Sequence, residues 1–166
     1  MEPMLLALEE ARKALDEGEI PVGAVLMRGE EVLWADHNRR EQTSDPTAHA
    51  EILCLREGAR KTGDWRLSGC DLYVTLEPCP MCAGALVMAR IDTCVYGAVD
   101  PACGCCGSVY DLPADPALHS SVRWRSGVMA EDCAALLGTF FARKRENSPN
   151  KEQKSKNESA PSRKSP

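Results

Sequence analysis

The sequence predicts an α/β domain of three layers, in which helices cover both faces of a central, mixed, five-stranded sheet. Segments with apolar residues at helical spacing alternate with short strand-like segments, in the order α-β-β-α-β-α-β-β-α. Two predicted strands, at 72–76 and 94–98, flank a helix, which indicates a right-handed crossover between parallel neighbours. The 166 residues, 43% of them hydrophobic, suit one domain with one core.

The first half of the chain predicts a helix, a hairpin and a second helix. Apolar residues recur at helical spacing over residues 3–17, and Gly18 is a natural helix end. Val22–Met27 and Glu31–Asp36 are typical of two strands joined by the turn RGE. The polar stretch REQTSDPT predicts a loop, and the next helix covers Ala48–Thr62.

The second half predicts three strands and two helices. A strand over Cys70–Leu76, a helix over Pro80–Arg90 and a strand over 93–99 follow one another closely. After the loop DPACGCCGS, a short strand is expected over 121–127 and an amphipathic helix over 130–146, its apolar side formed by Leu136, Leu137, Phe140 and Phe141. Four cysteines that stand singly in apolar stretches are expected to be buried: Cys54, Cys70, Cys94 and Cys133.

A change in composition divides the chain near residue 146. Residues 1–146 form the predicted domain, whereas 147–166 contain no large apolar residue and predict a disordered, basic and polar tail. The net charge is −5, yet residues 143–166 carry eight basic and three acidic side chains, so the rest of the chain is strongly acidic. An acidic body argues against general nucleic-acid coating but permits local phosphate contacts near the tail.

Cysteine usage and the absence of targeting signals predict a cytoplasmic protein. The N-terminus opens with an acid and lacks the basic region and cleavage site of a signal peptide, and charges interrupt every apolar run. Nine cysteines in a chain that is not exported indicate free thiols or metal ligands, not a disulfide framework.

His49, Cys79 and Cys82 are candidate metal ligands. Cys79 and Cys82 are spaced Cys-x-x-Cys at a predicted helix start, where backbone N–H groups favour thiolates. Cys-x-x-Cys alone also suits a redox pair or half of a structural zinc site. His49 lies at another predicted helix start and makes a third ligand. Three protein ligands and one open position are typical of a catalytic zinc, whose bound water ionises near neutral pH.

Glu51 is the candidate catalytic residue. It lies two residues after His49, rotated roughly 200° on a regular helix, and is therefore poorly placed to bind the same ion. It suits a proton shuttle beside the metal-bound water. The alternative is an ordinary acidic residue stabilising a helix start.

The segments HAE and PCPMC together match the zinc-deaminase signature H-x-E…P-C-x-x-C. Over residues 3–145 the chain resembles the cytidine-deaminase-like superfamily and, within it, the bacterial tRNA-specific adenosine deaminases. The resemblance is carried by EGEIPVGAVL, HNR, DPTAHAEI, LYVTLEPCPMCAGALVMARI, VYGAVD and GVMAEDCAALLGTFFARKR.

This resemblance implies a cytidine-deaminase-like fold and hydrolytic deamination of adenosine to inosine at the wobble position of an arginine tRNA anticodon. It implies one zinc per chain on His49, Cys79 and Cys82, a zinc-activated water, and Glu51 as the proton shuttle. It also implies a homodimer, an anticodon stem-loop as partner, and no membrane. The substrate-binding residues that it implies are Asn38, Ala50, Val22, Leu76 and Asp100.

Other interpretations stay open for several residues. Arg143, Lys144 and Arg145 either contact RNA phosphates or serve solubility and the C-terminal helix dipole. In the loop CGCCG, where this family has few or no cysteines, we expect no special role, with a second metal site or a redox-sensitive latch as alternatives; the cysteines are Cys103, Cys105 and Cys106.

Two other functions compete with the tRNA enzyme. The same chemistry serves a free nucleobase or nucleotide deaminase of guanine or cytosine type. A structural zinc module is the non-enzyme alternative, but such a module has no need of Glu51.

Overall fold

The computed structural model describes residues 2–147. The predicted tail lies outside the described residues except for Asn147. In chain order the elements are α1 (Pro3–Asp16), β1 (Gly23–Arg28), β2 (Glu31–His37), α2 (Arg40–Thr43), α3 (Ala50–Thr62), β3 (Cys70–Leu76), α4 (Pro80–Ala89), β4 (Thr93–Ala98), the 3-10 turn η1 (Pro116–Leu118), β5 (Arg123–Arg125) and α5 (Ala130–Glu146).

The five strands form one mixed sheet in the order β2-β1-β3-β4-β5. β1 pairs antiparallel with both β2 and β3, whereas β3, β4 and β5 run parallel. The crossover from β3 to β4 contains α4, as the sequence predicts. The expected mixed five-stranded sheet is therefore confirmed.

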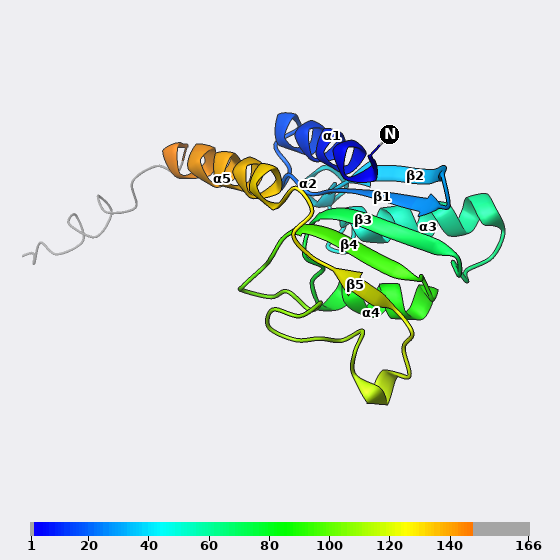
Figure 1. Cartoon of the computed structure of the whole chain (residues 1–166). Helices are drawn as coiled ribbons and strands as arrows, with labels where there is room; N and C mark the ends of the chain where they lie inside the picture. The colour runs from blue at the N-terminus through cyan, green and yellow to red at the C-terminus, as the bar shows by residue number, and fades with distance from the viewer. Residues whose placement is uncertain (1, 148–166) are drawn as a thin grey trace, which may run out of the picture.

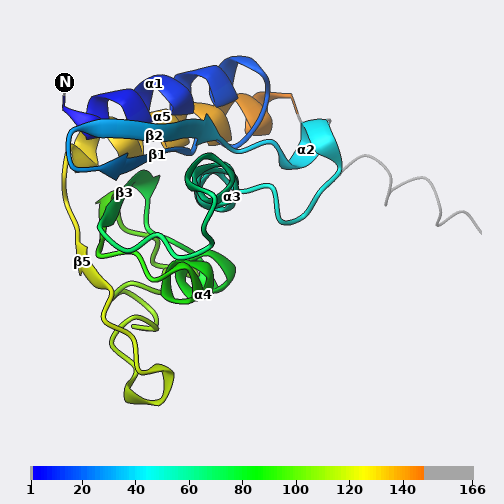
Figure 2. The same ribbon diagram turned by 90° about the vertical axis from the view of Figure 1, so that its right-hand side faces the viewer.

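Helices cover both faces of the sheet, so the molecule has three layers (Figures 1 and 2). α1 and α5 lie side by side on one face, and α3 and α4 lie on the other. Two hydrophobic cores lie on opposite faces of the sheet, and alternate residues of β1 pack into one core or the other. Ala24 and Leu26 pack in the α3/α4 core, and Val25 and Met27 pack in the α1/α5 core. This alternation lets both faces of one strand be apolar.

α1 approaches the start of β1 very closely. A Cβ atom added at Gly23 would lie 2.1 Å from the Ala7 carbonyl oxygen, so only glycine fits between helix and strand there. The chain just before Gly23 is consequently held against α1, and this segment forms one wall of the cavity described below.

The sequence-based expectations hold for most elements, with three differences. The expected polar loop contains the single helical turn α2, which is too short for apolar periodicity to reveal. β5 has three residues, fewer than the expected segment. Phe140 is buried as expected, but Phe141 is 48% exposed because the end of α5 extends beyond the sheet (Figure 1). The four single cysteines are buried.

Within residues 2–147, no helix combines the length and apolar character needed to cross a bilayer.

Candidate active site

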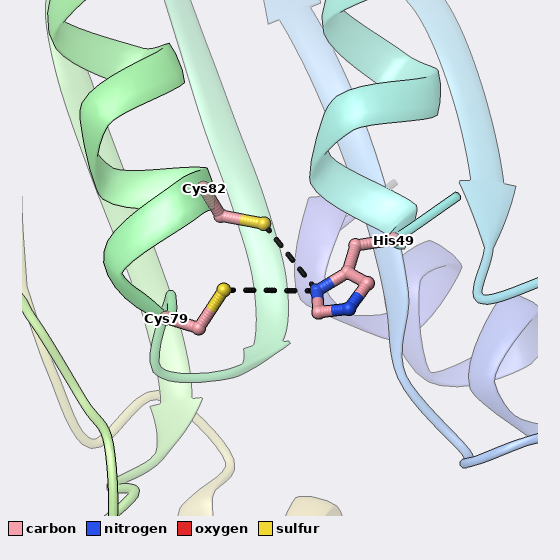
Figure 3. Close-up of side chains that lie close together, drawn as sticks. All are labelled: His49, Cys79 and Cys82. Carbon is pink, nitrogen blue, oxygen red and sulfur yellow. Dashed lines mark hydrogen bonds between the residues drawn. The ribbon is translucent and has the colours of Figure 1, made fainter. Parts of the chain in front are cut away.

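The N-termini of α3 and α4 bring three candidate metal ligands together (Figure 3). His49 and Cys79 are the N-cap residues of the two helices, and Cys82 lies in the first turn of α4. The Nδ1 atom of His49 lies 3.7 Å from the Cys79 sulfur and 3.6 Å from the Cys82 sulfur. The three ligand atoms thus converge on one point between the helices.

These spacings fit a tetrahedral zinc ion. With Zn–S bonds of about 2.3 Å and Zn–N bonds of about 2.0–2.1 Å at tetrahedral angles, the nitrogen and sulfur atoms lie about 3.6 Å apart. The donor set of one imidazole and two sulfurs is also one that zinc prefers. Three protein ligands leave a fourth position for water.

The two sulfurs differ in their affinity for a proton. A hydrogen bond from Cys82, followed by one involving His49, lowers the pKa of Cys79 to about 4. The same thiol-to-thiolate hydrogen bond, together with burial, raises the pKa of Cys82. The hydrogen bond to Cys79 in turn raises the pKa of His49. The lowered pKa of Cys79 favours its thiolate, the form of cysteine that binds metals.

Glu51 lies beside this cluster but outside the ligand group. Its side chain is buried, and burial raises the pKa of its carboxyl group. His49 has an extended backbone (φ −78°, ψ 150°) and so does not follow the helical rotation. Both side chains consequently face the same cavity, although a regular helix would separate them. A carboxyl group with a raised pKa holds a proton more readily than an exposed one, which suits a group that both takes up and releases protons.

A cavity of about 190 Å³ opens above the ligands. This volume is below the roughly 300–1,000 Å³ of pockets that enclose drug-sized molecules, so it suits a single base. The cavity is lined by eight residues that the sequence singled out as catalytic, zinc-binding or substrate-binding: Val22, Asn38, His49, Ala50, Glu51, Leu76, Cys79 and Asp100. Cys82 lies beneath it and is buried.

Two walls of the cavity depend on buried carboxylates. On one side, Asn38 donates a hydrogen bond from Nδ2 to Glu19 at 2.8 Å. On the other side, Glu77 accepts hydrogen bonds from the backbone N–H groups of Asp100, Cys106 and Ser108, each at 3.0 Å, and from the Ser108 hydroxyl. Glu77 therefore holds the loop that brings Asp100 to the cavity.

The loop cysteines do not converge on a metal. The Cys103 thiol donates to Asp100 Oδ2 at 3.0 Å, and the Cys105 thiol donates to the Cys103 carbonyl at 3.4 Å. Cys106 is buried, and its N–H group bonds Glu77. Among residues 2–147 these three cysteines do not belong to a group of three ligand atoms close enough together to hold one ion.

The predicted phosphate-contact residues lie apart from the base-sized cavity. Arg143 and Lys144 line a separate cavity of about 440 Å³ between the ends of α1 and α5, and Arg145 is exposed nearby on α5. The lining of this second cavity includes Gly18, only two residues before Ile20, which lines the base-sized cavity.

Sequence analysis missed four residues that line the base-sized cavity. Arg40 and Glu77 have ordinary surface character in the sequence, Ile20 precedes the expected first strand, and Cys103 was expected to have no role. Glu77 stands directly before the Pro-Cys motif, and this adjacency is the one signal that points to it.

Comparisons with known proteins find similarity to zinc-binding deaminases. Residues 2–98 match the family model described as the cytidine and deoxycytidylate deaminase zinc-binding region. The chain is 45% identical over 135 residues to the tRNA-specific adenosine deaminase of Bacillus subtilis, covering 81% of this chain and 84% of that protein.

Among solved structures, a tRNA deaminase is more similar to this chain than a guanine deaminase is. A structure from a study of A-to-I editing by tRNA:A34 deaminases at the wobble position shares 43% identity and a TM-score of 0.79, covering 81% of this chain and 98% of that chain. Guanine deaminase from Bacillus subtilis shares 29% identity and a TM-score of 0.58, covering 90% of this chain and 94% of that chain.

Proposed function

The chain belongs to the zinc-binding cytidine and deoxycytidylate deaminase family, and from this we propose that it hydrolyses adenosine to inosine at the wobble position of a tRNA anticodon. The observation that carries the proposal is the His49, Cys79 and Cys82 cluster next to buried Glu51 in a base-sized cavity. The greater similarity to tRNA-specific deaminases than to guanine deaminase supports RNA as the substrate.

His49, Cys79 and Cys82 would hold one zinc ion per chain. When bound there, zinc would lower the pKa of a water molecule at the open position and so supply the nucleophile. The N-termini of α3 and α4 favour the thiolate form of the ligands, because their unpaired N–H groups stabilise negative charge.

Glu51 would move protons during the reaction. It would take a proton from the attacking water and deliver it to adenine N1 as C6 is attacked. It would then take the second proton from the hydroxyl group added at C6 and transfer it to the N6 amine, which leaves as ammonia when the C6–N6 bond breaks, so that water and adenosine yield inosine and ammonia. Burial supports this role because it favours the protonated carboxyl group that such a shuttle must form.

The remaining cavity residues would bind the base. Asn38 can both donate to and accept from a purine edge, and the Ala50 N–H group lies in the first turn of α3, where it has no intrahelical partner. Val22 and Leu76 supply apolar walls. Asp100 would position the flanking ribose–phosphate chain at the mouth of the cavity.

The end of α5 would contact the phosphates of the anticodon stem-loop. Arg143 and Lys144 border the second cavity. Its lining includes Gly18, two residues before Ile20 of the base-sized cavity, so a strand of RNA could follow both cavities. Arg145 would add to the same positive surface. We expect a charge-reversed R143E/K144E protein to bind the stem-loop less tightly and with a shallower salt dependence.

A homodimer would cover the exposed apolar surface between α3 and α4. Met88 is 72% exposed, and Trp65 is 52% exposed. They border an apolar groove whose other lining residues include Ile52, Leu55, Ala59, Ala85 and Ala89. Replacement of Met88 by Glu is expected to shift sedimentation toward the monomer. The nine unpaired cysteines support activity in the reducing cytoplasm.

The deciding experiment is deamination of a synthetic arginine tRNA anticodon stem-loop, with free adenosine, cytidine and guanine assayed in parallel. Inosine at the wobble position, with the free compounds unchanged, is expected. A stem-loop with guanosine at that position controls for contaminating activities. Turnover of a free base with the stem-loop unchanged would instead assign the protein to the nucleobase deaminases, with the same metal and proton chemistry.

A further inference from the structure

Glu19 is an acidic residue with almost no contact with solvent. It lies in the turn between α1 and β1, is 1% exposed, and donates its backbone N–H to the Ala14 carbonyl at 2.9 Å. Buried carboxylates are rare unless they are paired or hydrogen-bonded. One Glu19 oxygen accepts from Asn38 Nδ2 at 2.8 Å, and the other accepts from the Gln42 backbone N–H at 2.7 Å.

The contact with Glu19 determines which way the Asn38 amide faces. An amide side chain has a donor end and an acceptor end, whereas an ionised carboxylate only accepts. The reverse orientation would place the Asn38 oxygen against a negative oxygen and lose the hydrogen bond. The Asn38 backbone is also fixed, since its N–H donates to the Val22 carbonyl at 3.0 Å. The amide therefore presents one defined pattern to the cavity.

Glu19 itself does not line the cavity. Its second contact fastens the backbone of α2, the turn that also carries the cavity residue Arg40. Glu19 thus reaches the substrate site only through neighbouring residues, and Asn38 is the one whose side chain it orients.

We propose that Glu19 is a positioning residue that holds the Asn38 amide in its substrate-binding orientation. The inference rests on the proposed role of Asn38 in the deaminase reaction. A glutamine at position 19 keeps the shape but has one acceptor oxygen for two donors, the Gln42 N–H and Asn38 Nδ2, so it no longer holds Asn38 in a single orientation. The free protein then spends part of its time in a form that binds the base poorly.

A double-mutant cycle tests this inference in the full-length, zinc-loaded protein. The proteins are wild type, E19Q, N38A and E19Q/N38A, assayed on the anticodon stem-loop. We expect E19Q to lower kcat/KM about tenfold, mainly through a higher KM, because it weakens a hydrogen bond to a charged group. In the N38A background the same substitution should have almost no effect, since the group that it positions is gone.

E17Q is the matched control. Glu17 lies in the same turn and accepts from His37 and Gln42 Nε2, but it does not contact Asn38. We expect E17Q to keep wild-type kcat/KM. Zinc content and melting temperature are measured for all variants, so that a general loss of folded protein is recognised.

Two results would overturn the positioning role. One is an effect of E19Q that is just as large in the N38A background, which would mean that Glu19 acts through general structure. The other is wild-type activity in N38A. Failure of the proposed function is distinguishable, because wild type would then not deaminate the stem-loop. The same cycle, run with whichever free base the wild type deaminates, would still decide whether Glu19 orients Asn38.

Discussion

Two groups of three potential metal ligands lie close together among residues 2–147, and they differ in what their side chains already contact. The first, the thiol cluster, consists of His49, Cys79 and Cys82. The second, the carboxylate cluster, consists of Glu10, Asp36 and His37. In the thiol cluster the ligand atoms face one another, at two helix N-termini.

In the carboxylate cluster every ligand has a strong partner. His37 lies between Glu10, 2.8 Å from Nδ1, and Glu17, 3.0 Å from Nε2. Asp36 accepts from Arg39 Nε at 2.9 Å. With a carboxylate oxygen against each ring nitrogen, His37 has no nitrogen left to face a metal ion. The comparison teaches that nearness of ligand atoms is insufficient: a metal centre also needs ligands that are not already paired.

The largest expected effect is loss of zinc from the thiol cluster. Replacement of Cys82 by Ser removes a soft ligand, so zinc content measured by atomic emission should fall well below one per chain and deamination should fall to background. C54A is the control, because Cys54 is a buried thiol on α3 outside the cluster. Full zinc content in C82S would show that the cluster is not the zinc site.

Next in size is the loss of turnover in E51Q. The amide cannot carry a proton, so kcat should fall roughly 10²–10⁴-fold, the usual contribution of general acid–base catalysis. Zinc content and melting temperature should stay near wild type. Activity within a few-fold of wild type would exclude Glu51 as the proton shuttle.

A moderate effect on stability alone is expected for the carboxylate cluster. H37Q leaves Glu10 and Glu17 without the ring between them, so unfolding free energy should fall by about 1–3 kcal/mol, a value reduced for the partial exposure of Glu17. Urea denaturation measures this, with H119N as the control at an exposed histidine. Zinc content should be unchanged; its loss in H37Q would make the second cluster a metal site after all.

The smallest effect is a change in acid sensitivity. The hydrogen bond with His37 holds the pKa of Glu17 below its ordinary value of 4.5. A lowered folded-state pKa gives stability that is present above pH 4.5 and is lost as pH falls below it. E17Q should therefore show a shallower loss of melting temperature in this acidic range. An unchanged pH profile would mean that Glu17 is not coupled to folding.

Much of the fold follows from local patterns. The strands from Cys70 to Leu76 and near 93–99 contain the expected β-branched and apolar residues, and Gly18 follows the first helix as the sequence suggests. The turn α2 and the exposed Phe141 could not be predicted. A four-residue helix has no period, and whether a helix end lies over the sheet depends on where the whole helix is placed.

The sequence by itself determined the proposed chemistry of this protein. The proposed ligands and Glu51 occur in two short motifs at helix starts, where spacing and backbone polarity favour zinc binding and proton transfer. Only the tertiary structure decided how the cavity walls are held. Glu19 meets Asn38 across 19 residues and Glu77 meets Cys106 across 29, and neither acid looks buried in the sequence. A carboxylate can be buried only where donors from distant segments surround it, and chain folding alone brings those donors together.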